Sequence, residues 1–162
     1  MVIYYRLPGV AAALALLVFA VLNFALYKLI PITLTLPAIT GFLISIGTAV
    51  DGNVLIFERI KEELRSGKRL EPSVRSGFDR AWTAISTSNL STIIICAVLF
   101  LFGSTFGAGA VRGFAVTLAL GLIINLFTAV TVTRTFLHFI LMPLSDEAVA
   151  EKNWLLGLTR GS

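Results

Sequence analysis

The chain is poor in charged residues, in cysteine and in histidine. Only 14% of its 162 residues are charged, against about 25% in an ordinary soluble domain, which is too few to cover a water-facing surface. The single cysteine, Cys96, excludes a disulfide framework within the chain. The single histidine, His138, excludes a histidine-rich metal site. No phosphate-binding glycine loop of the Walker type occurs, so ATP hydrolysis by that route is excluded, and we expect no metal, no cofactor and no enzyme activity.

The chain is instead rich in long apolar runs. Hydrophobic residues make up 57% of the chain, and about 20 consecutive apolar residues are needed to cross the hydrocarbon of a bilayer. We therefore predict an all-α, polytopic membrane protein with a helical bundle over 8–142 and a C-terminal tail over 143–162. The four helices expected to span the membrane are 8–30, 34–57, 84–102 and 113–139.

The first residues are too short a segment to span a membrane. Residues 1–7 begin with an apolar stub, and we expect them to be the end of a preceding helix that is cut short. A signal peptide is the alternative. Its charged region should precede its apolar region, however, and here Arg6 follows the stub.

Basic residues concentrate in the connection between the second and third spans. This 58–82 segment carries seven lysines and arginines, whereas the loops at the opposite ends of the spans hold only Lys28 and Arg112. An excess of lysine and arginine marks the cytoplasmic side. We predict a cytoplasmic 58–82 loop and cytoplasmic termini, and we interpret the charges as a topological anchor, with a regulatory patch as the alternative. Nucleic acid is not an expected partner.

The 58–82 connection has helical patterns of its own. We expect the second span to continue until Ser66-Gly67, since glycine suits a helix end. Pro72 then opens what we predict to be a separate helix lying at the membrane interface. Its apolar stripe consists of Val74, Phe78 and Trp82.

Asp51 is the only ionisable side chain between 34 and 57. A carboxylate inside the bilayer costs several kcal/mol unless it is paired or protonated, and such a residue is by default a candidate for proton or ion handling. The alternative is a structural acid that bonds to hydroxyls on neighbouring helices.

Small and polar residues predict which faces of the spans meet other helices. Small side chains every fourth position let helices approach closely, and hydroxyls or amides there can bond across the contact. The last span has such a stripe in Gly113, Thr117, Gly121 and Asn125, and the second span has a similar small stripe in Gly41, Ser45 and Ala49. Plain packing accounts for most of these positions, while Asn89 and Asn125 are the candidates to hydrate or orient Asp51. The supporting polar or packing residues are Asn53, Asn89, Thr92, Gly113, Thr117, Gly121 and Asn125.

The segment from Thr48 to Lys68, TAVDGNVLIFERIKEELRSGK, resembles the fourth-helix signature of the SecD family of protein-export membrane subunits. This family belongs to the resistance-nodulation-division (RND) superfamily of proton-driven membrane machines. The resemblance covers nearly everything from 4 to 137. The other matching blocks are YYRLPG (4–9), LTLPAITG (34–41), SGFDRAW (76–82) and RGFAVTLALGLIINLFTAVTVTRTFL (112–137).

The resemblance implies part of one RND-type half, in the bacterial cytoplasmic (inner) membrane. It implies a SecF partner and cooperation with the SecYEG channel and the SecA motor in the proton-driven export of preproteins. Asp51 matches the family's proton-coupling aspartate. Gly52 replaces the usual alanine, and Thr87 stands where an acid is common, so any second carboxylate of a relay is missing there. The alternatives are a small-molecule exporter core of the same superfamily and a passive membrane scaffold.

Overall fold

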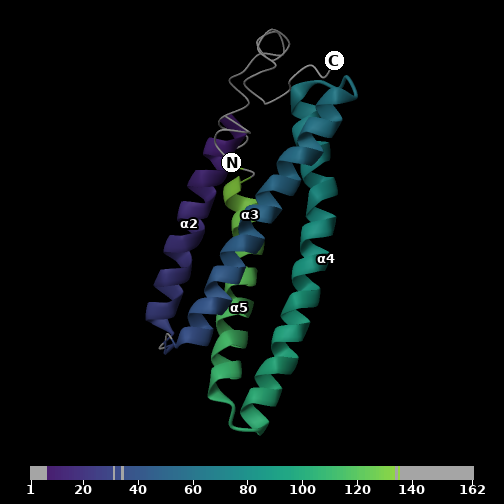
Figure 1. Cartoon of the computed structure of the whole chain (residues 1–162). Coiled ribbons are helices and arrows are strands. Elements are labelled where there is room, and N and C mark those ends of the chain that lie inside the picture. Colours follow the sequence, from purple (N-terminus) through teal and green to yellow (C-terminus); the bar gives the residue numbers. More distant parts are fainter. Residues whose placement is uncertain (1–6, 31, 34, 134, 136–162) are drawn as a thin grey trace.

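The computed structural model describes residues 7–30, 32–33, 35–133 and 135, and within them it contains helices and no strand. Figure 1 shows four long helices: α2 (Leu7–Leu29), α3 (Leu36–Arg65), α4 (Leu70–Thr105) and α5 (Gly109–Phe127), the last continued by the π-helix η1 (Thr128–Thr133). Each of the four is long and apolar enough to cross a membrane. The predicted all-α membrane bundle is therefore confirmed, while the stub before Leu7 and the 143–162 tail lie outside the described residues.

Helix α3 begins and ends at residues that suit those positions. The Thr35 hydroxyl accepts a hydrogen bond from the Ala38 amide at 3.4 Å, which caps the first turn. At the other end Ser66 is the C-cap and Gly67 adopts a left-handed backbone with φ 84°, the conformation that favours glycine after a helix. The predicted continuation of the second span to Ser66-Gly67 is confirmed. At 30 residues α3 is about 45 Å long, longer than the roughly 30 Å of hydrocarbon that it has to cross.

The prediction of a separate interfacial helix over 72–82 is wrong. Helix α4 runs unbroken for 36 residues from Leu70 to Thr105. Pro72 lies in its first turn, where a missing N–H breaks no helical hydrogen bond, and no proline or glycine interrupts 78–102. The apolar stripe packs against α3: Phe78 is buried in one cluster with Ile56 and Ile60, and Val74 and Trp82 pack against that cluster.

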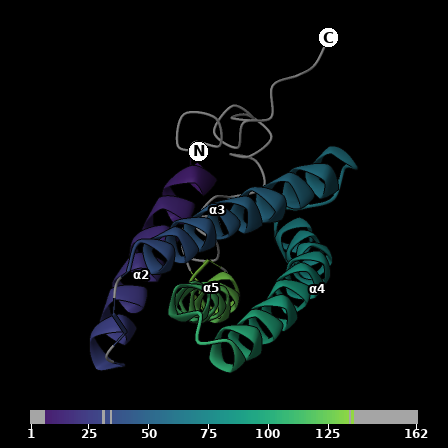
Figure 2. The same ribbon diagram turned by 60° about the horizontal axis from the view of Figure 1, so that its bottom comes forward.

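Helix α5 lies behind α3 and is flanked by α2, α3 and α4. Figure 2, which looks along the bundle, shows α5 between α2, α3 and α4, with α3 crossing over it. Glycines lie where the backbones of neighbouring helices come closest to each other. A Cβ on Gly77 of α4 would lie 2.7 Å from the Ile60 backbone nitrogen of α3, which is closer than real Cβ atoms come.

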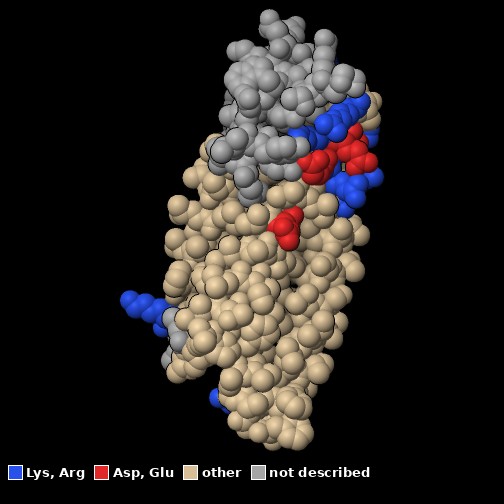
Figure 3. Space-filling view, viewed as in Figure 1, with Lys and Arg blue, Asp and Glu red and all other residues tan. Residues whose placement is uncertain are grey.

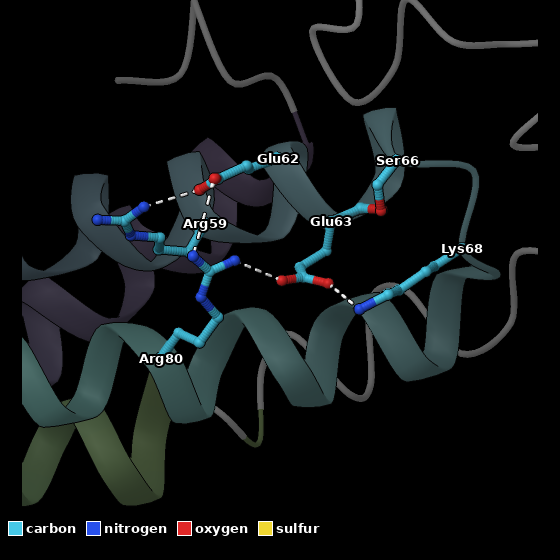
Figure 4. A network of polar contacts seen from close by, with 6 residues as sticks. All are labelled: Arg59, Glu62, Glu63, Ser66, Lys68 and Arg80. Carbon is cyan, nitrogen blue, oxygen red and sulfur yellow. Dashed lines mark hydrogen bonds and ion pairs between the residues drawn. The ribbon is translucent and has the colours of Figure 1, made fainter.

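The end of the bundle where α3 connects to α4, called the charged end below, carries most of the described charges. Figure 3 shows blue and red gathered there on an otherwise mostly tan surface. Figure 4 shows Glu63 of α3 accepting hydrogen bonds from Lys68 and from Arg80 of α4, the latter at 2.7 Å. Next to it Glu62 pairs with Arg59 at 2.7 Å. The Glu63 carboxylate therefore ties the end of α3 to the beginning of α4.

Glu63 lies beyond the stretch of α3 that the hydrocarbon can cover. It is about 40 Å along the helix from Leu36, against roughly 30 Å of hydrocarbon. The hydrogen bonds from Lys68 and Arg80 lower the pKa of Glu63. The pairing is therefore present at neutral pH and is lost as the pH falls through that lowered value.

Candidate functional site

Asp51 lies near the middle of α3 with its side chain exposed on the surface of the chain. No hydrogen bond or ion pair joins it to any residue that the structure describes. The alternative of a structural acid held by hydroxyls of neighbouring helices thus finds no support among the described contacts. What the chain presents here is a carboxylate that faces outward from an apolar helix.

Asp51 belongs to a face of α3 that no other described helix covers. Its members recur every three or four residues, the spacing of one helix face, and all of them are exposed: Thr40, Ile44, Gly47 and Asp51. A Cβ added to Gly47 would meet nothing within 4 Å. We refer to these four residues as the open face of α3.

The opposite face of α3 packs tightly on α5. Its buried members are Gly41, Ser45, Ala49, Gly52 and Asn53, which we call the covered face. A Cβ on Gly41 would lie 2.5 Å from Thr117 Oγ1 and 2.8 Å from the Phe114 carbonyl oxygen of α5. The predicted small stripe of the second span is thus in contact with α5.

The predicted stripe of α5 supplies the other side of this contact. A Cβ on Gly113 would lie 3.4 Å from Thr35 Oγ1, and a Cβ on Gly121 would collide with the Ser45 side chain. Thr117 is fully buried, and its backbone carbonyl accepts a hydrogen bond from Tyr27 of α2 at 3.3 Å. Packing therefore accounts for these three positions.

Asn53 follows Asp51 by two residues and points the other way. Positions two apart on a helix are separated by about 200° around its axis, so the aspartate is exposed while the asparagine is buried. Asn53 Oδ1 accepts a hydrogen bond from Thr133 Oγ1 at 2.9 Å. The Asp-x-Asn motif therefore sends its carboxylate outward and its amide into the bundle.

Sequence reasoning missed the π-helix that carries Thr133. A π-helical turn is rare and is often found at functional sites. Here it follows α5 over Thr128–Thr133, with the sequence TAVTVT. The signal for it is the run of β-branched residues, which fit an α-helix less well, yet this run alone does not predict a hydrogen bond to a residue 80 positions away.

Asn89 and Asn125 are buried inside the bundle, at 2% and 3% exposure. Neither makes a described hydrogen bond with Asp51, so their role in orienting it stays a prediction.

Thr92 of α4 donates a hydrogen bond to the Ser88 carbonyl of its own helix at 3.2 Å. Thr87, at the position where an acid is common, is exposed and donates to the Thr83 carbonyl at 2.8 Å.

The part of the chain that the structure describes contains no group of three or more histidine, cysteine, aspartate or glutamate side chains that could hold a metal ion. Cys96 is buried among Ala115, Leu118 and Leu122 of α5. Within the apolar stretch of α3, the ionisable side chain among the described residues is Asp51.

Comparisons with known proteins agree on one family. Residues 1–142 match the family described as protein export membrane protein SecD/SecF, C-terminal. The chain is 55% identical over 141 residues to protein translocase subunit SecD of Thermobaculum terrenum, covering 87% of this chain and 27% of that one. It is 54% identical over 144 residues to the SecD of a Synechocystis strain, covering 89% and 30%.

Solved structures give the same result for the fold. The crystal structure of SecDF from Thermus thermophilus, a translocon-associated membrane protein, superposes with a TM-score of 0.81 at 38% identity, over 88% of this chain and 19% of that one. A second crystal structure, of SecDF in a super-membrane-facing form, gives a TM-score of 0.76 at 40% identity, over 81% and 17%. The chain thus spans less than a third of the length of these relatives.

Proposed function

The chain belongs to the SecD/SecF C-terminal family of protein export membrane proteins, and we propose that it is the membrane part through which a SecD-type translocase subunit couples a proton gradient to protein export. In this proposal the subunit works with a SecF-type partner next to the SecYEG channel and the SecA motor. Its substrate is a preprotein. Asp51 is the residue that takes up and releases the proton.

The observation that carries the proposal is the position of Asp51 on the open face of α3. A charge at this depth of an apolar helix is costly unless it is paired or neutralised, and the described helices of the chain offer it neither. A second membrane half covering the open face supplies the missing surroundings. We infer that this half belongs to the SecF-type partner, because the relatives named as SecDF carry both names in one protein.

The coupling mechanism follows from the two environments that a partner can offer. Burial against apolar side chains favours the neutral acid, whereas water or a cation favours the carboxylate. Asp51 therefore binds the proton with different affinity in two alternative packings of the partner on α3. The proton gradient biases the equilibrium between these two packings. A shift of α3 reaches α4 through the Glu63–Arg80 pair at the charged end, about 18 Å along the helix from Asp51.

The test uses the full-length subunit in its complex and measures export of a preprotein into membrane vesicles with and without a proton gradient. Asparagine keeps the size of Asp51 and cannot titrate. Asp51→Asn is expected to reduce the gradient-dependent stimulation to the level without a gradient, while assembly with the partner stays intact. Asp51→Glu is expected to retain partial stimulation at best, because its carboxyl group is displaced by one methylene.

Asp79→Asn is the matched control, since Asp79 is an exposed aspartate of α4 in the segment before the apolar run of that helix. It is expected to leave the stimulation unchanged. If the Asp51→Asn complex still responds to the gradient, Asp51 is no coupling residue, and a passive scaffold becomes the better account.

We also propose that the charged end faces the cytoplasm, on the basis of its excess of lysine and arginine. Ser66 lies at this end and Ser104 at the opposite end, and both are exposed, whereas the native Cys96 is buried. In intact cells an impermeant thiol reagent is expected to label Ser104→Cys and to leave Ser66→Cys and Cys96 unlabelled. Labelling of Ser66→Cys alone would reverse the orientation.

A further inference from the structure

Two buried amides inside the bundle have hydrogen-bond donors without acceptors. Asn89 of α4 is 2% exposed and Asn125 of α5 is 3% exposed. The Nδ2 atom of each has no hydrogen-bond partner among the described residues. Leaving a buried donor unpaired is destabilising, and the surrounding hydrocarbon offers no acceptor in its place.

The two amides lie at the same depth of the bundle. Helices α4 and α5 meet near their connection, where a Cβ on Gly103 would lie 2.9 Å from the Arg112 backbone nitrogen. Counted from that contact, Asn89 lies about 21 Å back along α4 and Asn125 about 20 Å forward along α5, at 1.5 Å per residue. The antiparallel helices thus bring both residues to one level.

Both asparagines also lie on helix faces that take part in the contact between α4 and α5. Cys96 is two turns from Asn89 on the same face of α4, and it packs in one buried cluster with Leu118 and Leu122 of α5. Leu118 is in turn two turns from Asn125 on the same face of α5. The faces that form this cluster are therefore the faces that carry the two asparagines.

Helix α3 contributes small residues at this depth. Gly52 lies opposite Ile85, one turn from Asn89, and a Cβ there would have its nearest neighbour at 3.8 Å, an ordinary van der Waals distance. Ala49 of α3 is buried in a cluster with Ile124, the residue that precedes Asn125. Helix α3 thus brings a glycine and an alanine close to the residues that neighbour the two asparagines.

We propose that a water molecule is bound between Asn89 and Asn125 and accepts a hydrogen bond from each Nδ2 atom. A water oxygen has two lone pairs and so matches two convergent donors, and buried waters typically satisfy polar groups that lack other partners. The sequence places no lysine or arginine within two turns of either asparagine, so a neutral acceptor fits the site better than an anion. The inference does not rest on the proposed function.

The test is X-ray radiolytic footprinting of the full-length protein in its complex, in water labelled with oxygen-18. Bound water generates radicals locally and labels nearby side chains even when they are buried. Leu122 is one turn from Asn125 and 1% exposed, whereas Ile56 is equally buried in a different, apolar cluster. Leu122 is expected to take up label well above Ile56 in the native protein; equal labelling of the two would overturn the proposal.

Variants separate this site from other buried amides. In the double variant Asn89→Leu/Asn125→Leu, labelling at Leu122 is expected to fall to the level of Ile56. Asn23→Leu is the matched control, because Asn23 of α2 is also fully buried with an unpaired side-chain oxygen, and it is expected to leave the labelling at Leu122 unchanged. Persistence of the label in the double variant would contradict the site.

If the double variant does not fold, the proposed water is tested by a density map of the native complex that resolves water molecules. A peak about 2.7–3.2 Å from both Nδ2 atoms supports the site. An empty gap, or a direct hydrogen bond between the two amides, overturns it.

Discussion

The two faces of α3 are built from similar residues but have different surroundings. The covered face contains Gly41, where an added Cβ would clash with α5, and Ser45, whose side chain lies against Gly121 of α5. The open face contains Gly47, around which a Cβ would find free space, and Asp51, which has no described partner. Small and polar residues on the covered face are explained by the packing of this chain. Those on the open face are not, and we attribute them to the partner that the proposed function requires.

The largest difference expected between the two faces is in their contribution to folding stability. Gly41→Ala is expected to lower the free energy of unfolding by about 1–3 kcal/mol, because its Cβ would press on the α5 backbone and force it to shift. Gly47→Ala is expected to leave stability unchanged or raise it by up to about 1 kcal/mol, through the better helix propensity of alanine. Thermal unfolding of the purified chain in detergent, followed by circular dichroism, measures both. Equal effects of the two variants would mean that the two faces do not differ as described.

A smaller effect concerns partner binding. Gly47→Leu places a large side chain on the open face one turn from Asp51, and it is expected to weaken association with the SecF-type partner by about 1 kcal/mol, roughly five-fold. The folding of this chain should be unaffected, since the position faces open space. The measurement is the amount of partner retained on affinity-purified subunit over a dilution series.

Ala25→Leu serves as the control for that variant, because Ala25 is an exposed small residue of α2 outside the open face. It should leave retention of the partner unchanged. Undiminished retention with Gly47→Leu would show that the partner does not cover the open face.

Features that depend on a few neighbouring residues could be predicted from the sequence. The end of α3 at Ser66-Gly67 is one of them, because glycine can adopt the left-handed backbone that follows a helix. The small stripe that includes Gly41 and Ser45 is another, since spacing along a helix is enough to identify a contact face. The prediction of a separate helix after Pro72 is wrong, because a proline in the first turn does not show how far the helix extends beyond it.

Features that depend on distant parts of the chain could not be predicted. Glu63 pairs with Arg80 across two helices, and Asn53 bonds to Thr133 across most of the chain. The exposure of Asp51 is of the same kind. Periodicity shows which residues share a face with it, but the placement of α2, α4 and α5 around α3 (Figure 2) determines which of those residues are exposed.

Whether Asp51 and the partner together form a proton site is tested by proton flux through the full-length subunit and its partner in proteoliposomes, driven by an imposed pH gradient. We predict flux through the native complex, none through the complex carrying Asp51→Asn, and none through this chain alone, whose described helices leave the open face uncovered. Unchanged flux in the Asp51→Asn complex, or flux through this chain alone that Asp51→Asn abolishes, would contradict a proton site completed by the partner.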